Sequence, residues 1–281
     1  MTTRSALVAL HAAVALFGFA ALFGKWIALP ATAIVLGRTA IAAATLAIVA
    51  RLRHQPLGRP AAALGLNGAL LALHWVSFFA AVQVANVAIG LLGYAAFPVF
   101  VFALERGSAG GTRGRSAWLG TLLATVGLVA LVPDFSWSSS ATRGLVLGLV
   151  SGFTFAWLAV RNRRLVAAVS ATRIALWQNL YATACLLPIV AIVDGAAAWP
   201  GRADLGLLAV LGVLCTGVAH TLFIGSMRRV SAHTASVVAA LEPVYGIALA
   251  AWLLREIPDA RTAVGGALIV AAALLASRRA A

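Results

Sequence analysis

Residues 86–104 have the sequence NVAIGLLGYAAFPVFVFAL, which is 19 consecutive residues without a charged side chain. A helix of about 20 apolar residues spans the hydrocarbon core of a bilayer, so this stretch predicts a transmembrane helix. The rest of the chain has the same character, since 63% of its 281 residues are hydrophobic and 10% are charged. A soluble domain has roughly 45 to 50% apolar and about 25% charged residues, so a soluble globular enzyme is excluded.

Nine further apolar runs, each bounded by charge, Pro or Gly, predict nine more spans. Their approximate ranges are 5–24, 31–50, 61–82, 116–132, 143–160, 172–193, 203–227, 232–254 and 261–277. The runs are about twice as long as the strands of a membrane barrel, and they are apolar on all sides. We therefore expect an all-α polytopic membrane protein with ten transmembrane helices in a lipid bilayer.

The formal net charge of +14 lies in short clusters between the predicted spans. Because the cations form no basic stripe and no recognition motif, we expect no nucleic-acid partner. With the N-terminus inside, 15 of the 21 Lys and Arg residues lie on the cytoplasmic side and five on the other, while Arg38 falls within a span. The positive-inside rule then predicts that both termini are cytoplasmic.

Three short segments recur in the same order in the second half of the chain. The pairs are Ile34–Arg38 with Ile174–Gln178, Pro98–Phe100 with Pro243–Tyr245, and Gly120–Leu123 with Gly266–Ile269. We therefore expect two five-helix repeats, at residues 1–138 and 139–281. Because five is odd, the repeats must be inverted with respect to each other. Inverted repeats that enclose a midplane site are the architecture of alternating-access transporters.

Pro98 and Pro243 predict matched breaks in the fourth and ninth spans. Proline has no N–H, so Pro98 frees the carbonyl of Tyr94 and Pro243 frees that of Ala239. Interrupted helices at corresponding positions of two repeats point to a transport site, so both prolines are candidate hinges. The alternative is a tolerated kink that a neighbouring Ser or Thr satisfies.

Two charged residues are predicted to lie deep in the membrane. Glu242 is about ten residues, or roughly 15 Å, into the ninth span, and Arg38 is about 11 Å from the opposite surface in the second span. An ionisable group at such depth should face the bundle interior, so Glu242 is a candidate for proton sensing or for binding a substrate ammonium group, with Arg38 as its charge partner. The alternatives are a structural ion pair and snorkelling to the surface.

Aromatic and polar residues away from the membrane surface predict an amphipathic cavity. His74 and Phe78 share one face of the third span, and Phe153 and Trp157 share one face of the sixth. Together with Tyr94 and Glu242 they are the candidate substrate-binding residues, with His220 and Asn86 as secondary candidates. Helix packing is the alternative role for any single aromatic residue. Gly144, Gly148 and Gly152 also recur every four residues, which predicts close approach of a neighbouring helix.

The chain has no recognisable catalytic, metal-binding or cofactor-binding motif. It lacks a phosphate loop, an H-E-x-x-H motif and a G-x-S-x-G motif, so we expect no enzyme, no metal and no cofactor. The fifth and tenth spans contain almost no polar side chains and would either brace the halves or form a dimer contact. A monomer or a homodimer is expected.

Several motifs resemble those of EamA-type permeases of the drug/metabolite transporter superfamily. They are Tyr94–Phe100 (YAAFPVF) followed by Glu105, Leu241–Tyr245 (LEPVY) followed by Arg255–Glu256, and Gly265–Val270 (GGALIV). The resemblance covers essentially the whole chain and implies a ten-helix carrier of the bacterial inner membrane. The position of Tyr94 four residues before Pro98 is similar to the aromatic amino acid exporters of this superfamily, although Ala96 departs from their pattern.

The resemblance and the repeats together predict a secondary transporter of a small molecule. The resemblance alone favours export of neutral amino acids, with aromatic and hydrophobic ones preferred. Export of drugs or other small metabolites is the first alternative. An intramembrane lipid-handling enzyme and a scaffold without transport activity are alternatives of other classes.

Overall fold

The structure is a computed structural model that describes residues 2–56, 58, 62–106, 122–123, 126–127, 129–130 and 136–277. All regular secondary structure in these ranges is helical, as the sequence predicts. Helices in the first part of the chain are α1 (Thr3–Ala20), α2 (Phe23–Trp26), α3 (Ala31–Leu52), α4 (Ala62–Val84), α5 (Val87–Tyr94) and α6 (Phe97–Arg106). Later helices are α8 (Ser140–Leu165), α9 (Ala171–Val193), α10 (Arg202–Gly212), α11 (Ala219–Ser226), α12 (Ala232–Ala239), α13 (Glu242–Leu253) and α14 (Ala260–Ser277), with a 3-10 turn at Gly195–Ala198 and a π-helical turn at Val213–Val218.

Seven helical segments of the described residues are long and apolar enough to cross a membrane. They are Thr3–Trp26, Ala31–Leu52, Ala62–Val84, Val87–Leu104, Ser140–Leu165, Ala171–Val193 and Arg202–Ser226. The expected span at 116–132 lies outside the described residues except for three short pieces. Helices α12 and α13 occupy the expected span at 232–254, and α14 occupies the last. The multi-pass helical architecture is confirmed, and the count of ten remains a prediction.

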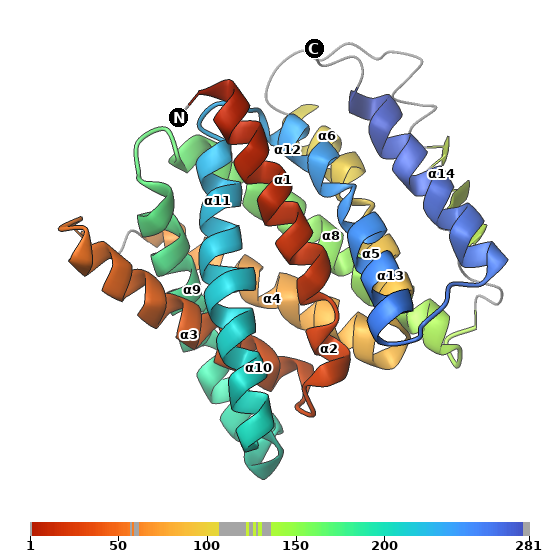
Figure 1. Ribbon diagram of the computed structural model, residues 1–281, viewed down its shortest axis with the longest axis horizontal. Coiled ribbons are helices and arrows are strands. Elements are labelled where there is room, and N and C mark those ends of the chain that lie inside the picture. Colours follow the sequence, from red (N-terminus) through yellow and green to blue (C-terminus); the bar gives the residue numbers. More distant parts are fainter. Residues whose placement is uncertain are drawn as a thin grey trace.

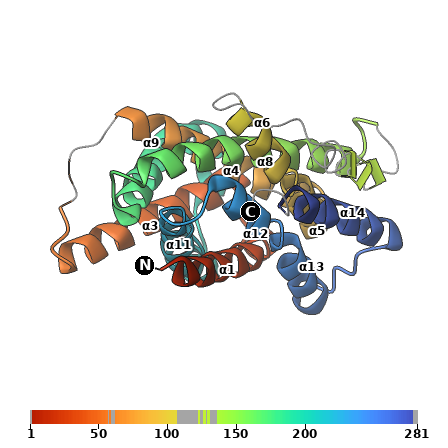
Figure 2. The ribbon, with the colours of Figure 1, turned by 90° about the horizontal axis from the view of Figure 1, so that it is seen from above.

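The helices form two groups on opposite sides of the molecule. Helices α1 and α11 lie on one side and α8 and α9 on the other (Figure 2). Helix α4 packs against both α8 and α9, and α1 packs against α11 and α13. The start of α1 and the end of α14 lie at the same end of the bundle (Figure 1). Segments far apart in the sequence therefore pack against one another.

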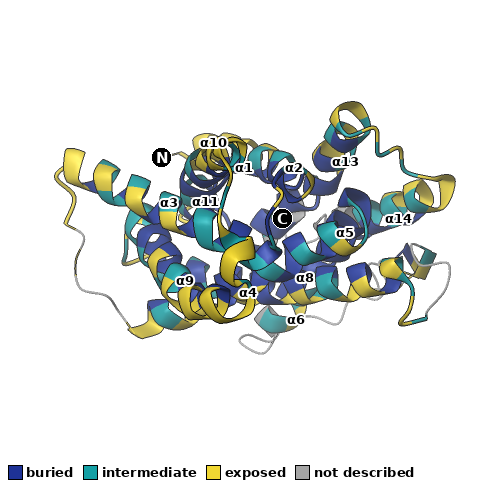
Figure 3. Cartoon of the chain, turned by 90° about the horizontal axis from the view of Figure 1, so that it is seen from below, coloured by how far each residue is buried: buried dark blue, intermediate teal, exposed yellow. Residues whose placement is uncertain are grey.

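The burial pattern fits a protein surrounded by lipid. Buried faces of the helices point toward the middle of the bundle and exposed faces point outward (Figure 3). Large apolar side chains such as Leu52, Ile192 and Trp199 are strongly exposed on the outside. A contiguous apolar exterior is unfavourable in water but is what a bilayer solvates.

Polar side chains inside the bundle satisfy one another across helices. Asn162 on α8 accepts hydrogen bonds from the Asn67 amide of α4, at 3.0 Å, and from the Gln178 amide of α9. All three side chains are buried, and hydrocarbon offers no water to pair with them. This amide cluster therefore fixes the register of three helices.

The predicted glycine pattern of α8 allows α5 to approach closely. A Cβ atom added at Gly148 would lie 2.9 Å from the Cα of Gly93, and one added at Gly152 would lie 2.9 Å from the carbonyl oxygen of Tyr94. Such distances leave no space for a side chain, so the prediction of close helix approach is confirmed.

Candidate functional site

A buried cavity lies between the two sides of the bundle and is lined by seven helices. Its lining residues are Phe17, Ala20, Arg38, His74, Trp75, Phe78, Tyr94, Phe155, His220 and Glu242. The cavity has a volume of about 20 Å³. One ordered water needs about 10 to 15 Å³ by this measure, so the cavity is too constricted for an amino acid.

An aromatic wall forms one part of the cavity. The ring centroid of His74 lies 4.6 Å from that of Phe155, in a stacked arrangement, and 5.6 Å from that of Tyr94. The Nδ1 atom of His74 is within hydrogen-bonding distance of the Ser151 hydroxyl, at 2.8 Å. Helix geometry places His74 and Phe78 on one face of α4 because they are four residues apart. The structure thus brings His74, Phe78 and Tyr94 together, as expected.

Phe153 and Trp157 lie on the opposite face of α8 from the cavity. Their side chains are 42% and 39% exposed, whereas Phe155 is 3% exposed and lines the cavity. Two residues along a helix turn the side chain by about 200°, so Phe153 and Phe155 cannot face the same way. The structure therefore places Phe155 in the cavity wall, and neither Phe153 nor Trp157 is a lining residue. The polar Ser151, four residues before Phe155 and on the same face, is the sequence signal that marks this face.

Three phenylalanine rings pack together at the cavity. The rings of Phe17, Phe155 and Phe223 are mutually packed, with centroid distances of 5.3 to 6.4 Å. Phe17 and Phe155 line the cavity, and Phe17 precedes the lining residue Ala20 by one helical turn. This cluster therefore forms part of the cavity wall next to α1.

Arg38 is held at the cavity by the π-helical turn at Val213–Val218. Its side chain is 1% exposed, its Nε atom donates to the Thr216 hydroxyl at 2.8 Å, and its Nη2 atom donates to the Cys215 carbonyl at 3.3 Å. The guanidinium carbon lies 3.9 Å from the centroid of the Trp75 ring, which is a cation–π contact. A π-helical turn displaces main-chain carbonyls from the regular pattern, and such turns are frequent at functional sites. Sequence reasoning gave no sign of this turn.

Glu242 reaches the cavity from the first turn of α13. Its side chain is 5% exposed, and its Oε2 atom has no hydrogen-bond partner in the described part of the chain. Its carboxylate interacts with the Tyr94 hydroxyl and, at longer range, with the charge of Arg38. The expected Arg38–Glu242 pair therefore shares one cavity without direct contact between the charged groups. Arg38 instead contacts Trp75 and Thr216.

His220 and Trp75 complete this side of the cavity. His220 is fully buried, and neither ring nitrogen has a hydrogen-bond partner among the described residues. Its ring packs edge-on against Trp75, with a centroid distance of 5.6 Å. The sequence marked His220 only as a secondary candidate, and Asn86, the other one, caps α5 by accepting a hydrogen bond from the Ile89 N–H at 2.8 Å.

Both predicted prolines stand at helix breaks beside the cavity. Helix α5 ends at Tyr94 and α6 begins at Phe97, so Pro98 lies in the first turn of α6; α12 ends at Ala239, and Pro243 lies in the first turn of α13. Each break packs on a glycine of another helix. The Tyr94 carbonyl oxygen would be 2.9 Å from a Cβ at Gly152, and the Glu242 carbonyl oxygen would be 3.0 Å from a Cβ at Gly18. A proline in the first turn costs no hydrogen bond, which explains why both helices restart there.

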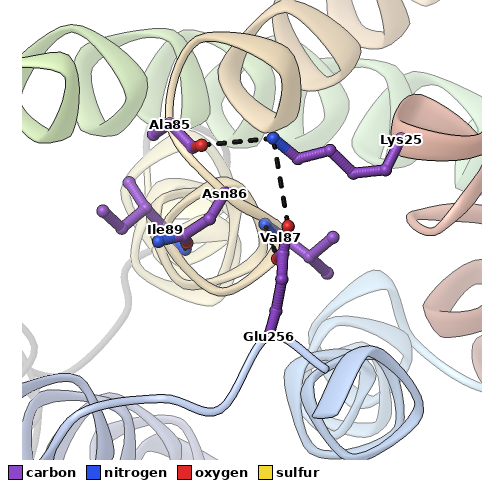
Figure 4. A network of polar contacts seen from close by, with 6 residues as sticks. All are labelled: Lys25, Ala85, Asn86, Val87, Ile89 and Glu256. Atoms are coloured by element: carbon purple, nitrogen blue, oxygen red, sulfur yellow. Dashed lines mark hydrogen bonds and ion pairs between the residues drawn. The ribbon is translucent and has the colours of Figure 1, made fainter. Parts of the chain in front are cut away.

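A polar network ties together three segments at the end of the bundle where α1 stops (Figure 4). The Lys25 ammonium donates to the Ala85 carbonyl at 3.2 Å and lies 3.9 Å from the Glu256 carboxylate. The other oxygen of Glu256 accepts a hydrogen bond from the Val87 N–H at 3.0 Å. These contacts join α2, the α4–α5 connection and the α13–α14 connection.

Within the ranges that the structure describes, no three His, Cys, Asp or Glu side chains are grouped so that they could hold a metal ion. The cavity instead combines one cation, one carboxylate, two imidazoles and aromatic rings. This set can bind a small organic molecule that carries both charges and an apolar part.

Comparisons with known proteins point to membrane transport. The EamA-like transporter family matches residues 142–278. An uncharacterized transporter of Archaeoglobus fulgidus is 29% identical over 204 residues, which cover 72% of this chain and 71% of that protein. The pseudopaline exporter CntI of Pseudomonas aeruginosa is 28% identical over 256 residues, covering 89% of this chain and 87% of that protein. A solved crystal structure with 22% sequence identity superposes with a TM-score of 0.75, covering 99% of this chain and 100% of that chain, and so shares the fold.

Proposed function

We propose that this chain exports neutral amino acids by alternating access, because the EamA-like transporter family matches residues 142–278 and two relatives are named as a transporter and an exporter. Aromatic and hydrophobic amino acids are the favoured substrates. The observation that carries this proposal is the buried cavity in which Glu242 keeps one carboxylate oxygen unpartnered beside the rings of Tyr94 and Phe155. A carboxylate attracts an ammonium group, and aromatic rings pack against an apolar side chain.

The proposed architecture has ten spans in two inverted five-helix repeats, at residues 1–138 and 139–281. It is supported by the correspondence of Pro98 and Pro243, each in the first turn of a helix that restarts after a break, and each beside a glycine contact. In such transporters the repeats rock around a site at the membrane midplane. The two prolines serve as hinges because a proline nitrogen carries no N–H, so each break has one backbone hydrogen bond fewer than a continuous helix.

Alternating access requires that the cavity open to each side in turn. The constricted cavity supports alternating access, because a substrate cannot enter it as it stands. In this proposal the packed rings of Phe17, Phe155 and Phe223 cover one side of the cavity, and the Lys25–Glu256 network covers the other. A substrate enters only when one cover opens. With both termini in the cytoplasm of a bacterial inner membrane, the rings face the cytoplasm and the Lys25–Glu256 network faces outward.

The binding residues in this proposal are His74, Phe78, Tyr94, Phe155 and Glu242. Phe153 and Trp157 have no place in it, since their side chains face away from the cavity. Glu242 meets the substrate ammonium group, and the His74–Tyr94–Phe155 wall holds the side chain. Arg38 balances the negative charge of Glu242 at a distance.

Export of another small metabolite is the second candidate. The relative named as a pseudopaline exporter, which aligns over 89% of this chain, favours it. The two candidates differ in which solutes compete for transport.

Flux through purified protein in liposomes tests the proposal. Labelled phenylalanine is exchanged against unlabelled phenylalanine, leucine, glutamate or lysine, with Ile192→Ala on the lipid-exposed face of α9 as a matched control. Saturable exchange that phenylalanine and leucine inhibit, and glutamate and lysine do not, is expected for both proteins. Absence of exchange, or exchange that no amino acid inhibits, overturns the proposal.

Replacing Glu242 by Gln tests its role in this flux. Loss of a charge-assisted hydrogen bond costs roughly 1.5 to 3 kcal/mol, so the half-saturating phenylalanine concentration should rise about 10- to 100-fold. The measurement is made across a range of pH values. Normal transport by Glu242→Gln at every pH shows that Glu242 neither binds the substrate nor responds to protons.

A further inference from the structure

Arg38 carries a buried positive charge that no carboxylate contacts. Its side chain is 1% exposed, and its hydrogen-bond acceptors are the Thr216 hydroxyl and the Cys215 carbonyl, both of them neutral. Removing an ion from water is costly unless an opposite charge pairs with it. Glu242 lines the same cavity but makes no ion pair with Arg38 in the described structure.

The bonding pattern of Arg38 leaves donors free on one edge of its guanidinium group. The Nε and Nη2 atoms bond to the π-helical turn and the Trp75 ring covers one face, while Nη1 makes no hydrogen bond to the residues that the structure describes. Arg38 is a lining residue, so this free edge borders the cavity. A planar guanidinium with free donors matches the geometry of a carboxylate or a phosphate, and the carboxylate is the anionic group of an amino acid.

His220 supplies a second unpartnered group beside Arg38. It follows Thr216 by four residues and so lies on the same helix face as the hydroxyl that holds Arg38. Trp75 contacts both side chains, since the Arg38 charge lies over its ring and the His220 ring packs against its edge. His220 is fully buried and lines the cavity, and within the described chain both of its nitrogens lack partners. In either neutral tautomer one nitrogen carries an N–H and can donate to an anion.

We infer that Arg38 and His220 form a carboxylate subsite of the cavity, with Glu242 on α13 receiving the ammonium group of the same molecule. The cavity would therefore select zwitterions and reject analogues that lack either charge. This inference rests on the proposed export of amino acids, and it adds the group that recognises the α-carboxylate. Trp75 is a positioning residue that holds the guanidinium plane in place.

Competition by truncated analogues tests the subsite in the wild-type protein without any substitution. Exchange of labelled phenylalanine in liposomes is inhibited with unlabelled phenylalanine, with phenethylamine, which lacks the carboxylate, or with 3-phenylpropionate, which lacks the amine. Phenylalanine is expected to inhibit at least about 30-fold more strongly than either analogue, because each analogue leaves one buried charged group unpaired. Equal inhibition by phenylalanine and phenethylamine overturns the subsite.

Variants assign the effect to its residues. Arg38→Gln and His220→Leu should weaken inhibition by phenylalanine about 10- to 100-fold and leave inhibition by phenethylamine unchanged. Glu242→Gln should also weaken inhibition by phenylalanine, but it should leave inhibition by 3-phenylpropionate unchanged. Arg261→Gln, at the exposed start of α14, is the control for loss of a cation. If Arg38 had a merely structural role, Arg38→Gln would weaken inhibition by phenylalanine and by phenethylamine equally, and that outcome overturns the subsite. Absence of phenylalanine exchange in the wild type refutes the proposed function, whereas exchange that discriminates neither analogue refutes the subsite alone.

Discussion

Replacing Glu256 by Ala is expected to open the cavity from the end of the bundle where α1 stops. Glu256 accepts a hydrogen bond from the Val87 N–H at 3.0 Å and lies 3.9 Å from the Lys25 ammonium. Its removal separates the α13–α14 connection from α2 and from the α4–α5 connection. Lys25→Met is the matched variant, because it removes the ion pair and the bond to Ala85 but keeps the bond between Glu256 and Val87.

The geometry of these contacts sets the size of the two effects. A hydrogen bond to a charged group contributes roughly 1.5 to 3 kcal/mol, and a partly exposed ion pair contributes about 0.2 to 1 kcal/mol. The Lys25 and Glu256 side chains are 27% and 29% exposed, so the lower part of each range applies. Glu256→Ala should therefore destabilise the closed state by about 2 kcal/mol, or about 30-fold in population. Lys25→Met should have a similar effect, because it also removes one hydrogen bond of a charged group together with the ion pair.

Labelling of a cavity cysteine measures this opening. Ala20→Cys places a thiol on the cavity wall, five residues before Lys25, in a background where the exposed Cys185 is replaced by Ser. The rate of modification by a membrane-impermeant thiol reagent should rise in both Lys25→Met and Glu256→Ala relative to the background protein. No increase in either variant would refute the assignment of this network as the closure.

Two further pairs of substitutions test the packing around the cavity. Phe155→Ala should lower the free energy of unfolding by about 3 to 5 kcal/mol and abolish phenylalanine exchange, because Phe155 is buried among other rings. Phe153→Ala should lower the free energy of unfolding by under about 1 kcal/mol, because Phe153 is not buried. A thermal melt and the exchange assay measure both effects, and equal losses would contradict the assigned faces of α8. Gly152→Ala should slow transport and lower the melting temperature, since its Cβ would lie 2.9 Å from the Tyr94 carbonyl oxygen, while Gly206→Ala on α10, with nothing within 4 Å, should raise stability by up to about 1 kcal/mol. A thermally neutral Gly152→Ala variant would show that the close approach can relax.

The residues that the sequence placed correctly share one physical property: they are unfavourable in lipid. Arg38, His74 and Glu242 are polar groups deep in apolar runs, so they had to face the interior, and all three line the cavity. Phe153 and Trp157 carry no such constraint. An aromatic ring is stable both against lipid and inside the bundle, so its face cannot be deduced from its spacing along a helix that is apolar on all sides.

The sequence alone determined that the chain is helical and crosses a membrane, and it located the helix breaks at Pro98 and Pro243. These features depend on local chemistry, because a backbone in hydrocarbon must bond to itself and a proline cannot take part. Only the tertiary structure decided which face of each helix points inward, and that Arg38 is held by the π-helical turn at Val213–Val218 instead of by Glu242. Those features depend on contacts between distant segments, which set the rotation of each helix about its own axis. Small residues such as Gly148 and Gly152 let neighbouring helices approach closely enough to make these contacts.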